Sequence, residues 1–385
     1  MKRSTERILT THVGSLPRPQ AFLDITPRPG EPAVVDQATW EATLSASIAE
    51  VVREQAGVGI DVISDGEFGK SNWQAYIMER VSGYEARPVP PHKWSYIGRD
   101  LETFSEFYRE TRPELFQPRT RWVCTGPIQY NPAHLTRDIA NFRSALAQPG
   151  VHVDEAFMPV IAPGSIALDD QNVYYPDDDA YVHAVAEALK HEYHAIIDAG
   201  FVLQVDDAVL ANMHDLLSVD GEERYLRWAE SRIEALNYAL EGIPEDRVRY
   251  HICWGSWHGP HTTDVPLRTI VNIILKARTQ AYSIEAANPR HEHEFQVWQD
   301  VKLPEGKVLI PGVVTHRTPV VEHPDVVAMR ILRYAQIVGR ENVIASTDCG
   351  FSQGTRTQRV HPTIAWAKLA SLVEGARRAT RALWS

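Results

Sequence analysis

Four residues of this chain have side chains that a divalent metal ion could bind, and they lie in short stretches tens of residues apart. The candidate ligands are His251, Cys253, Glu285 and Cys349. Zinc binds imidazole nitrogen, cysteine sulfur and carboxylate oxygen in tetrahedral geometry, and a site with one ligand that can leave is a catalytic one. We therefore predict a catalytic Zn²⁺ site in which Glu285 is the weakly held ligand.

Each candidate ligand also has a simpler explanation. His251 and Cys253 alone fit a core strand with two incidental polar side chains, and only Glu285 and Cys349 favour a metal. A structural zinc site is the next alternative, but closed structural sites more often use Cys and His without a carboxylate. The third cysteine, Cys124, lies in an apolar run and is predicted to be a small buried hydrophobic residue.

The candidate ligands must be brought together by separate elements, because no compact finger motif contains them. Each lies at or near the end of a run with β-branched or aromatic residues, namely 249–253, 281–285 and 342–349. Ligands at the C-terminal ends of several strands are what a (β/α)₈ barrel provides. The pattern therefore predicts that the three runs are strands of one barrel, with their C-terminal ends at the same face.

A repeated order of helix and strand supports an α/β fold of this kind. A helical pattern over 37–57 precedes the apolar run 60–64, and a second over 181–199 precedes the run 201–205. Amphipathic helices followed by short apolar strands are typical of parallel βα units. We predict a TIM barrel.

We expect residues 1–385 to form one barrel domain, because no Gly/Ser-rich linker divides the chain. The stretch near residues 87–118 is rich in proline and aromatic residues and interrupts the alternation of helix and strand patterns. It is predicted to be an insertion or lid. Two domains are the minority alternative.

Composition restricts the location and the partners. The chain has 39 basic and 50 acidic residues, a net charge of −11 without a basic block, which argues against a nucleic-acid partner. There is no apolar run of membrane length and no apolar segment of a secretory signal at the start. Three cysteines suit a reducing compartment. The expectation is a cytoplasmic protein with no membrane partner.

Ordered motifs along nearly the whole chain resemble a known family. Besides the stretches with the metal ligands, the motifs are Thr10–Arg18, Asp65–Glu67, Thr125–Pro127 and Gln204–Asp207. In this order they resemble the catalytic half of cobalamin-independent methionine synthase and its short single-barrel relatives, which include epoxyalkane:coenzyme M transferase. A set of ordered motifs is far more specific than any single one.

The resemblance implies a (β/α)₈ barrel in which zinc binds a substrate thiol and activates it for alkylation. The four candidate ligands match the zinc ligands of that family. Glu67 and Asp206 match carboxylates that hold the amino group of homocysteine, and Gly14 and Ser15 match a loop near that amino acid. Helix capping and solvated loop positions are the simpler explanations of the two carboxylates.

Two departures from the family pattern concern the other reactant. The Ser-Arg-Ser that follows the zinc glutamate in the family is replaced by Ala287-Asn288-Pro289. Arg317 occupies the position of the family's catalytic histidine, and His316 is one residue away. His316 and Arg317 are therefore the candidate catalytic residues, and the identity of the alkyl donor stays open.

The resulting functional hypothesis is a zinc-dependent transfer of an alkyl group, most simply methyl, to a small thiol such as homocysteine. A free thiol has a pKa near ~8.5, and zinc coordination deprotonates it at neutral pH. The donor could be methylfolate, methylcobalamin or another alkylated compound. Epoxyalkane:coenzyme M chemistry and a non-catalytic zinc- or thiol-binding protein are the alternatives.

Overall fold

The protein contains eight parallel strands that form one sheet within the residues described by the computed structural model, which are 1–27, 31–89, 97–117, 119–168, 171–219, 221–355 and 357–385. A parallel bridge between Thr11 and Val62 joins the two outer strands and closes the sheet into a barrel. In order around the barrel the strands are β1 (Leu9–Thr10), β10 (Ile344–Thr347), β9 (Val308–Val314), β8 (Ala281–Glu285), β7 (Val248–Ile252), β6 (Val202–Asp207), β5 (Glu155–Ile161) and β2 (Val62–Ile63). The predicted TIM barrel is confirmed.

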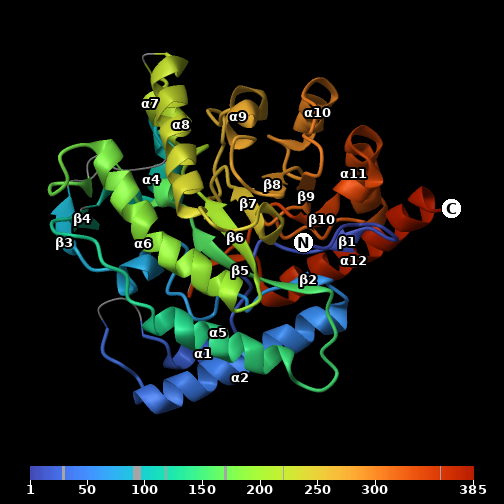
Figure 1. The fold of residues 1–385 in the computed structure, drawn as a ribbon, viewed down its shortest axis with the longest axis horizontal. Coiled ribbons are helices and arrows are strands. Elements are labelled where there is room, and N and C mark those ends of the chain that lie inside the picture. The colour runs from blue at the N-terminus through green and yellow to red at the C-terminus, as the bar shows by residue number, and fades with distance from the viewer. Residues whose placement is uncertain (28–30, 90–96, 118, 169–170, 220, 356) are drawn as a thin grey trace.

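Helices surround these strands, with α2 and α5 on one side of the barrel and α9, α10 and α11 on another (Figure 1). The helices are α1 (Gln20–Ile25), α2 (Gln37–Val58), α3 (Arg99–Thr103), α4 (Ser105–Thr111), α5 (Ala133–Leu146), α6 (Asp178–Asp198), α7 (Met213–Leu217), α8 (Glu222–Ala239), α9 (Leu267–Ile274), α10 (Val297–Asp300), α11 (Pro324–Val338) and α12 (Pro362–Leu383). Because the helices cover the outside, every residue of β7, β8, β9 and β10 is buried.

Local capping sets both ends of α2, the helix that leads into β2. Asp36 accepts a hydrogen bond from the Thr39 N–H at 2.7 Å and so caps the start of α2. Gly59 ends this helix at φ +94°, a left-handed conformation that glycine adopts without steric cost. The strand β2 begins three residues later, in agreement with the predicted βα rhythm.

The predicted insertion is a structured excursion between the second and third barrel strands. Strands β3 (Tyr84–Val89) and β4 (Arg119–Cys124) pair as an antiparallel hairpin at the left edge of Figure 1, and α3 and α4 lie between them. Residues 90–96 and 118 of the predicted insertion lie outside the described residues. Tyr108 and Leu115 belong to a small apolar cluster of this segment, against which Trp257 packs. The insertion therefore contacts the loop that follows β7.

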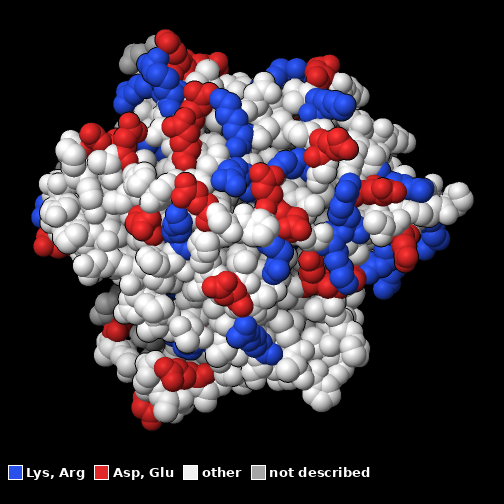
Figure 2. Space-filling view, in the orientation of Figure 1, with Lys and Arg blue, Asp and Glu red and all other residues white. Residues whose placement is uncertain are grey.

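The surface agrees with the mixed charge pattern of the sequence. On the face shown in Figure 2, acidic and basic side chains alternate and no large area of one sign is visible. Among the described residues, no helix combines the length and the apolar composition needed to cross a bilayer.

Candidate metal centre and substrate pocket

Three of the four predicted ligands meet at the C-terminal ends of β7 and β10. The ligand atoms of His251, Cys253 and Cys349 all lie within 4.8 Å of one another, and all three residues are buried. The two sulfur atoms are 3.7 Å apart. Two sulfurs bound at about 2.3 Å to one tetrahedral zinc ion would be separated by about 3.8 Å. The sulfur positions therefore fit a shared metal ion without rearrangement.

The imidazole of His251 is held in a suitable orientation. Its Nδ1 atom lies 3.2 Å from the Ser283 hydroxyl, which fixes the ring from the neighbouring strand β8. Its Nε2 atom is buried and has no well-formed hydrogen bond within the described part of the chain. An outer partner on one ring nitrogen and a free second nitrogen is the usual arrangement of a metal-binding histidine.

Hydrogen bonds from the loop after β7 orient the two sulfurs. The Ser256 hydroxyl donates to Cys349 Sγ at 3.1 Å, and the Gly255 N–H donates to Cys253 Sγ at 3.3 Å. The hydrogen bond to Cys349 and burial raise the pKa of the Cys253 thiol well above its ordinary value. A bound cation would offset this cost of forming thiolates, so the donor set fits a metal such as zinc.

Glu285, the predicted fourth ligand, is engaged by other groups and is not one of the three clustered residues. Its Oε1 atom accepts the Trp254 N–H at 2.9 Å, and its Oε2 atom accepts from the Asn288 amide at 2.6 Å. Oε2 also forms an ion pair with the Arg317 guanidinium at 3.0 Å. The role of Glu285 as a metal ligand stays a prediction, and it would require a carboxylate oxygen to leave these partners.

The candidate catalytic residues His316 and Arg317 follow β9 and lie beside the centre. Arg317 bridges Glu285 and His261 Nε2, with a 2.6 Å contact to the imidazole. His316 is completely buried, and neither of its ring nitrogens has a hydrogen-bond partner in the described chain. Burial and the Arg317 charge hold the pKa of His316 well below its ordinary value. Because neither side chain lines the pocket described next, their catalytic roles stay predictions.

A pocket of about 290 Å³ opens beside the three clustered ligands and contains most of the predicted substrate-binding residues. It is lined by Val13, Ser15, Glu67, Trp73, Ile97, Arg112, Leu115, Asp206, Ala208, Asn212, His251, Cys253, Gly255, Ser256, Trp257, Cys349, Gly350, Gln353 and Arg359. The two predicted carboxylates and the three clustered ligands therefore face one cavity.

Gly14 adjoins Glu67, one of the pocket residues, and its lack of a side chain leaves room for the Glu67 carboxylate. Its φ angle is +135°, and a Cβ atom there would lie 2.6 Å from Glu67 Oε1 and 2.6 Å from Pro159 Cγ. Ser15 is buried, and its hydroxyl has no hydrogen-bond partner among the described residues. The loop after β1 thus approaches Glu67 more closely than any residue with a side chain would permit.

The two predicted substrate carboxylates have different environments. Glu67 adopts a φ of +61°, which is unusual for a residue other than glycine, and its carboxylate lies 3.5 Å from the Lys70 ammonium. Asp206 accepts a hydrogen bond from the Gln204 amide at 2.7 Å. Burial raises the pKa of Asp206, and the Glu67 charge adds to this effect, whereas His251 opposes it. A cationic group between the two carboxylates would relieve their repulsion.

Several pocket residues were not identified from the sequence. Trp73 and Arg359 lie in irregular segments, Arg112 lies in the insertion, and Gln353 lies in the three-residue strand β11 (Ser352–Gly354). In such segments the sequence spacing does not show which side chains face a pocket. Only the loop after β7 could have been anticipated, since it directly follows two candidate ligands. In that loop Trp257 does line the pocket.

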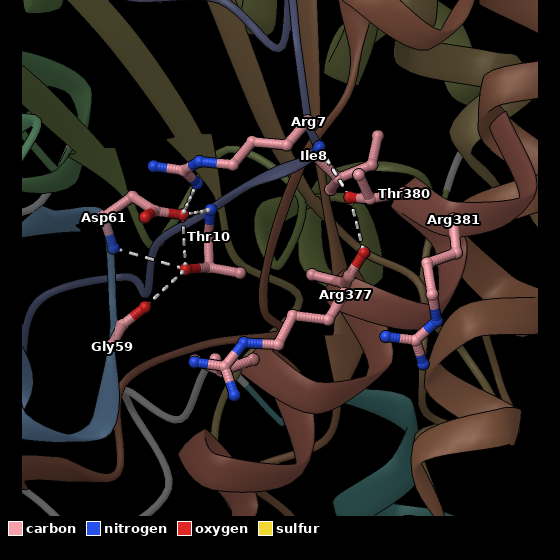
Figure 3. A pocket seen from close by; sticks show the side chains of 10 residues that line it. Arg7, Ile8, Thr10, Gly59, Asp61, Arg377, Thr380 and Arg381 are labelled. Carbon is pink, nitrogen blue, oxygen red and sulfur yellow. Dashed lines mark hydrogen bonds and ion pairs between the residues drawn. The ribbon is translucent and has the colours of Figure 1, made fainter. Parts of the chain in front are cut away.

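The larger of the two cavities described lies away from this centre. It has a volume of about 440 Å³ and lies beside the starts of β1 and β2 and the last turns of α12 (Figure 3). Its arginines are Arg7, which pairs with Asp61 at 2.8 Å, and Arg377 and Arg381 on α12. Because none of the clustered ligands lines it, volume alone does not locate the chemistry.

The fold and the buried cluster define the class: a (β/α)₈ barrel protein with a candidate two-cysteine, one-histidine metal centre at the C-terminal ends of its strands. The chain belongs to the family described as "Cobalamin-independent synthase, Catalytic domain", whose model matches residues 8–99 and 108–377. The resemblance found in the sequence motifs is thereby confirmed.

Similar proteins cover nearly the whole chain. A methionine synthase of Thermococcus kodakarensis is 24% identical over 378 residues, covering 97% of this chain and 94% of the relative. A 2-hydroxypropyl-CoM lyase of Xanthobacter autotrophicus is 25% identical over 405 residues, with 96% and 94% covered. The solved B12-independent methionine synthase of Shewanella sp. W3-18-1 has a TM-score of 0.72 at 17% identity, covering 98% and 99% of the two chains. This last likeness concerns the fold.

Proposed function

We propose that the protein is a zinc-dependent enzyme that transfers an alkyl group, most simply methyl, to a small thiol such as homocysteine. The observation that carries the proposal is the clustering of His251, Cys253 and Cys349 within 4.8 Å at one end of the pocket. Family membership and the methionine synthases among the similar proteins support the reaction class. In this reaction the thiol gives up its proton to the solvent or to the departing donor, and the thiolate forms a sulfur–carbon bond. The bond from that carbon to the donor breaks, and its electron pair leaves with the donor.

His251, Cys253 and Cys349 are the residues that would hold the zinc ion. A bound Zn²⁺ would lower the pKa of a substrate thiol and so supply a sulfur nucleophile at neutral pH. Ser256 and Ser283 hold the ligand side chains in place through the contacts described above. Since both sulfurs are buried and hydrogen-bonded in advance, little rearrangement is needed to form the site.

Glu67 and Asp206 would bind the ammonium group of an amino-acid thiol. Both line the same pocket as the clustered ligands, and the space above Gly14 is filled by the Glu67 carboxylate. Two buried acceptors complement an ammonium group through charge-assisted hydrogen bonds. This arrangement favours homocysteine over a simple alkyl thiol.

A second candidate function is the addition of a thiol to an epoxide. The 25% identity to a 2-hydroxypropyl-CoM lyase favours it, and Arg317 at the position of the family's catalytic histidine leaves it open without discriminating. In that reaction the sulfur–carbon bond forms, a carbon–oxygen bond of the epoxide breaks, and the resulting alkoxide takes a proton. A non-catalytic zinc- or thiol-binding role would leave binding intact without any turnover.

The metal assignment is tested by comparing two cysteine variants. Cys349→Ala is expected to lose bound zinc and thiol alkylation together, measured by elemental analysis and by thiol consumption. Cys124→Ala is the matched control, because Cys124 is buried but is not one of the clustered residues. Unchanged zinc content in Cys349→Ala would disprove the metal site.

The reaction is tested by incubating zinc-loaded protein and homocysteine or coenzyme M with methylfolate, methylcobalamin and a short epoxyalkane in turn. Methylated homocysteine is the expected product. An epoxide-derived thioether would favour the second candidate instead. Thiol binding without turnover for every donor would contradict the proposal of an enzyme that uses these donors.

A further inference from the structure

Two arginines line the same pocket as the clustered ligands, although they come from distant parts of the chain. Arg112 follows α4 in the insertion, and Arg359 directly follows β12 (Thr357–Gln358). Burial lowers the pKa of Arg359, and the neighbouring Arg112 charge lowers it further, so the two cations repel each other. Bringing two guanidinium groups to one pocket is unfavourable unless an anion joins them.

Arg359 is connected to the candidate metal centre by a single side chain. Its Nε atom donates to Gln353 Oε1 at 2.8 Å, and Gln353 Nε2 lies 4.0 Å from Cys349 Sγ. Gln353 also donates to the Gly350 carbonyl at 2.6 Å, which fixes its orientation. An anionic group near Arg359 would therefore lie a short distance from any sulfur atom held between Cys253 and Cys349.

The positive charge of Arg359 and Arg112 is largely uncompensated within the described chain. Arg359 has no carboxylate within ion-pair distance there, and Arg112 pairs with Glu114, whose side chain is 55% exposed. Burial lowers the pKa of the nearby His258, and Arg359, Arg317 and Arg112 lower it further. A planar guanidinium group binds carboxylates and sulfonates through two parallel hydrogen bonds. The side of the pocket lined by Arg359 and Arg112 therefore suits a carboxylate or a sulfonate.

We propose that Arg359, assisted by Arg112, binds the anionic group of the thiol substrate. The thiol is then a small acid whose carboxylate or sulfonate lies two or three carbons from its sulfur. This inference rests on the proposed function, because it assumes that a thiol occupies the space beside Cys253 and Cys349. For an amino-acid thiol, Arg359 would bind the acid group while Glu67 and Asp206 bind the ammonium group.

The test uses zinc-loaded protein and four thiols of similar size that differ in end-group charge. These are 2-mercaptoethanesulfonate, 3-mercaptopropionate, neutral 2-mercaptoethanol and cationic cysteamine, each titrated by calorimetry. The two anionic thiols are expected to bind about tenfold or more tightly than 2-mercaptoethanol, as for a charged hydrogen bond. Arg359→Gln should remove that advantage and leave the 2-mercaptoethanol affinity and the zinc content within about twofold.

The matched control is Arg377→Gln, which also removes an arginine from a pocket. Arg377 is an exposed residue of α12 and lines the cavity of Figure 3, away from the clustered ligands. This variant is expected to bind all four thiols like the unaltered protein. An Arg359→Lys variant, which keeps the charge but not the planar fork, should retain part of the preference.

The possible negative results distinguish a failure of this inference from a failure of the proposed function. Equal binding of anionic and neutral thiols, or an equal loss for all thiols in Arg359→Gln, would overturn the inference and leave the proposed function standing. If only the KM of an anionic alkyl donor rises in that variant, Arg359 binds the anionic group of the donor and not that of the thiol. The inference is then also overturned. Absence of binding for all four thiols and for homocysteine would refute the proposed function and the inference with it.

Discussion

Replacing Arg317 by Gln tests how much the ion pair between Arg317 and Glu285, beside the metal centre, stabilises the folded protein. The two side chains are 3.0 Å apart, with the Glu285 side chain 0% and the Arg317 side chain 12% exposed. Among the described residues, Arg317 is the only cation within ion-pair distance of the Glu285 carboxylate. In Arg317→Gln, Glu285 keeps its hydrogen bonds from the Trp254 N–H and the Asn288 amide.

The size of the effect follows from the fate of the buried charge. Breaking a buried ion pair by removing one partner costs about 3–5 kcal/mol. With two hydrogen bonds retained, we expect the free energy of unfolding to fall by about 3 kcal/mol at pH 7.

The assay is urea unfolding of the metal-free protein at pH 7. Glu285→Gln alone leaves Arg317 without its anion, whereas the double variant removes both charges. The double variant should therefore regain about 2 kcal/mol relative to the sum of the single variants.

Two results would refute this reasoning. The first is a loss below about 1 kcal/mol at pH 7, which would mean that the pair is solvated or replaceable. The second is simple additivity of the two substitutions, which would mean that the two charges do not interact.

Three further predictions concern the surroundings of the centre. Gly14→Ala should lower the free energy of unfolding by about 1–3 kcal/mol in thermal denaturation, because of the positive φ and the 2.6 Å approach to Glu67; an unchanged Tm would contradict this. Ser256→Ala should weaken zinc binding by about 10- to 100-fold in chelator competition, since the hydroxyl orients a candidate thiolate ligand; unchanged affinity would exclude that role. Burial opposes but hydrogen bonds to two carboxylates raise the pKa of His291 to about 9. Its stabilising contribution, the difference in unfolding free energy between the unaltered protein and His291→Gln, should be complete below about pH 6.5 and disappear as the pH rises through 9; a flat difference would refute it.

Strand ends were the part of the site most accessible to sequence reasoning. The run 281–285 is reproduced residue for residue as β8, and the run 249–253 is shifted by one residue in β7. A short buried strand is specified by local composition, and in a parallel barrel all its C-terminal ends meet at one face. Cys253 and Cys349 could therefore be placed together although 96 positions separate them.

The insertion was only partly predictable. Proline and aromatic residues indicated a break in the barrel, but not the hairpin of β3 and β4 or its packing beside the loop after β7. Antiparallel pairing across a long excursion depends on the register of residues far apart in sequence. As a result, Arg112 could not be assigned to the pocket in advance.

The sequence by itself determined the barrel, the family and the three residues that now form the candidate metal cluster, because each depends on local patterns and on the common face of parallel strands. Only the tertiary structure decided that Glu285 pairs with Arg317, that Gly14 adjoins Glu67 and that Arg112 and Arg359 line one pocket. These arrangements bring together residues of segments that are far apart in the sequence. Their geometry depends on how the loops pack, and no spacing in the sequence encodes it.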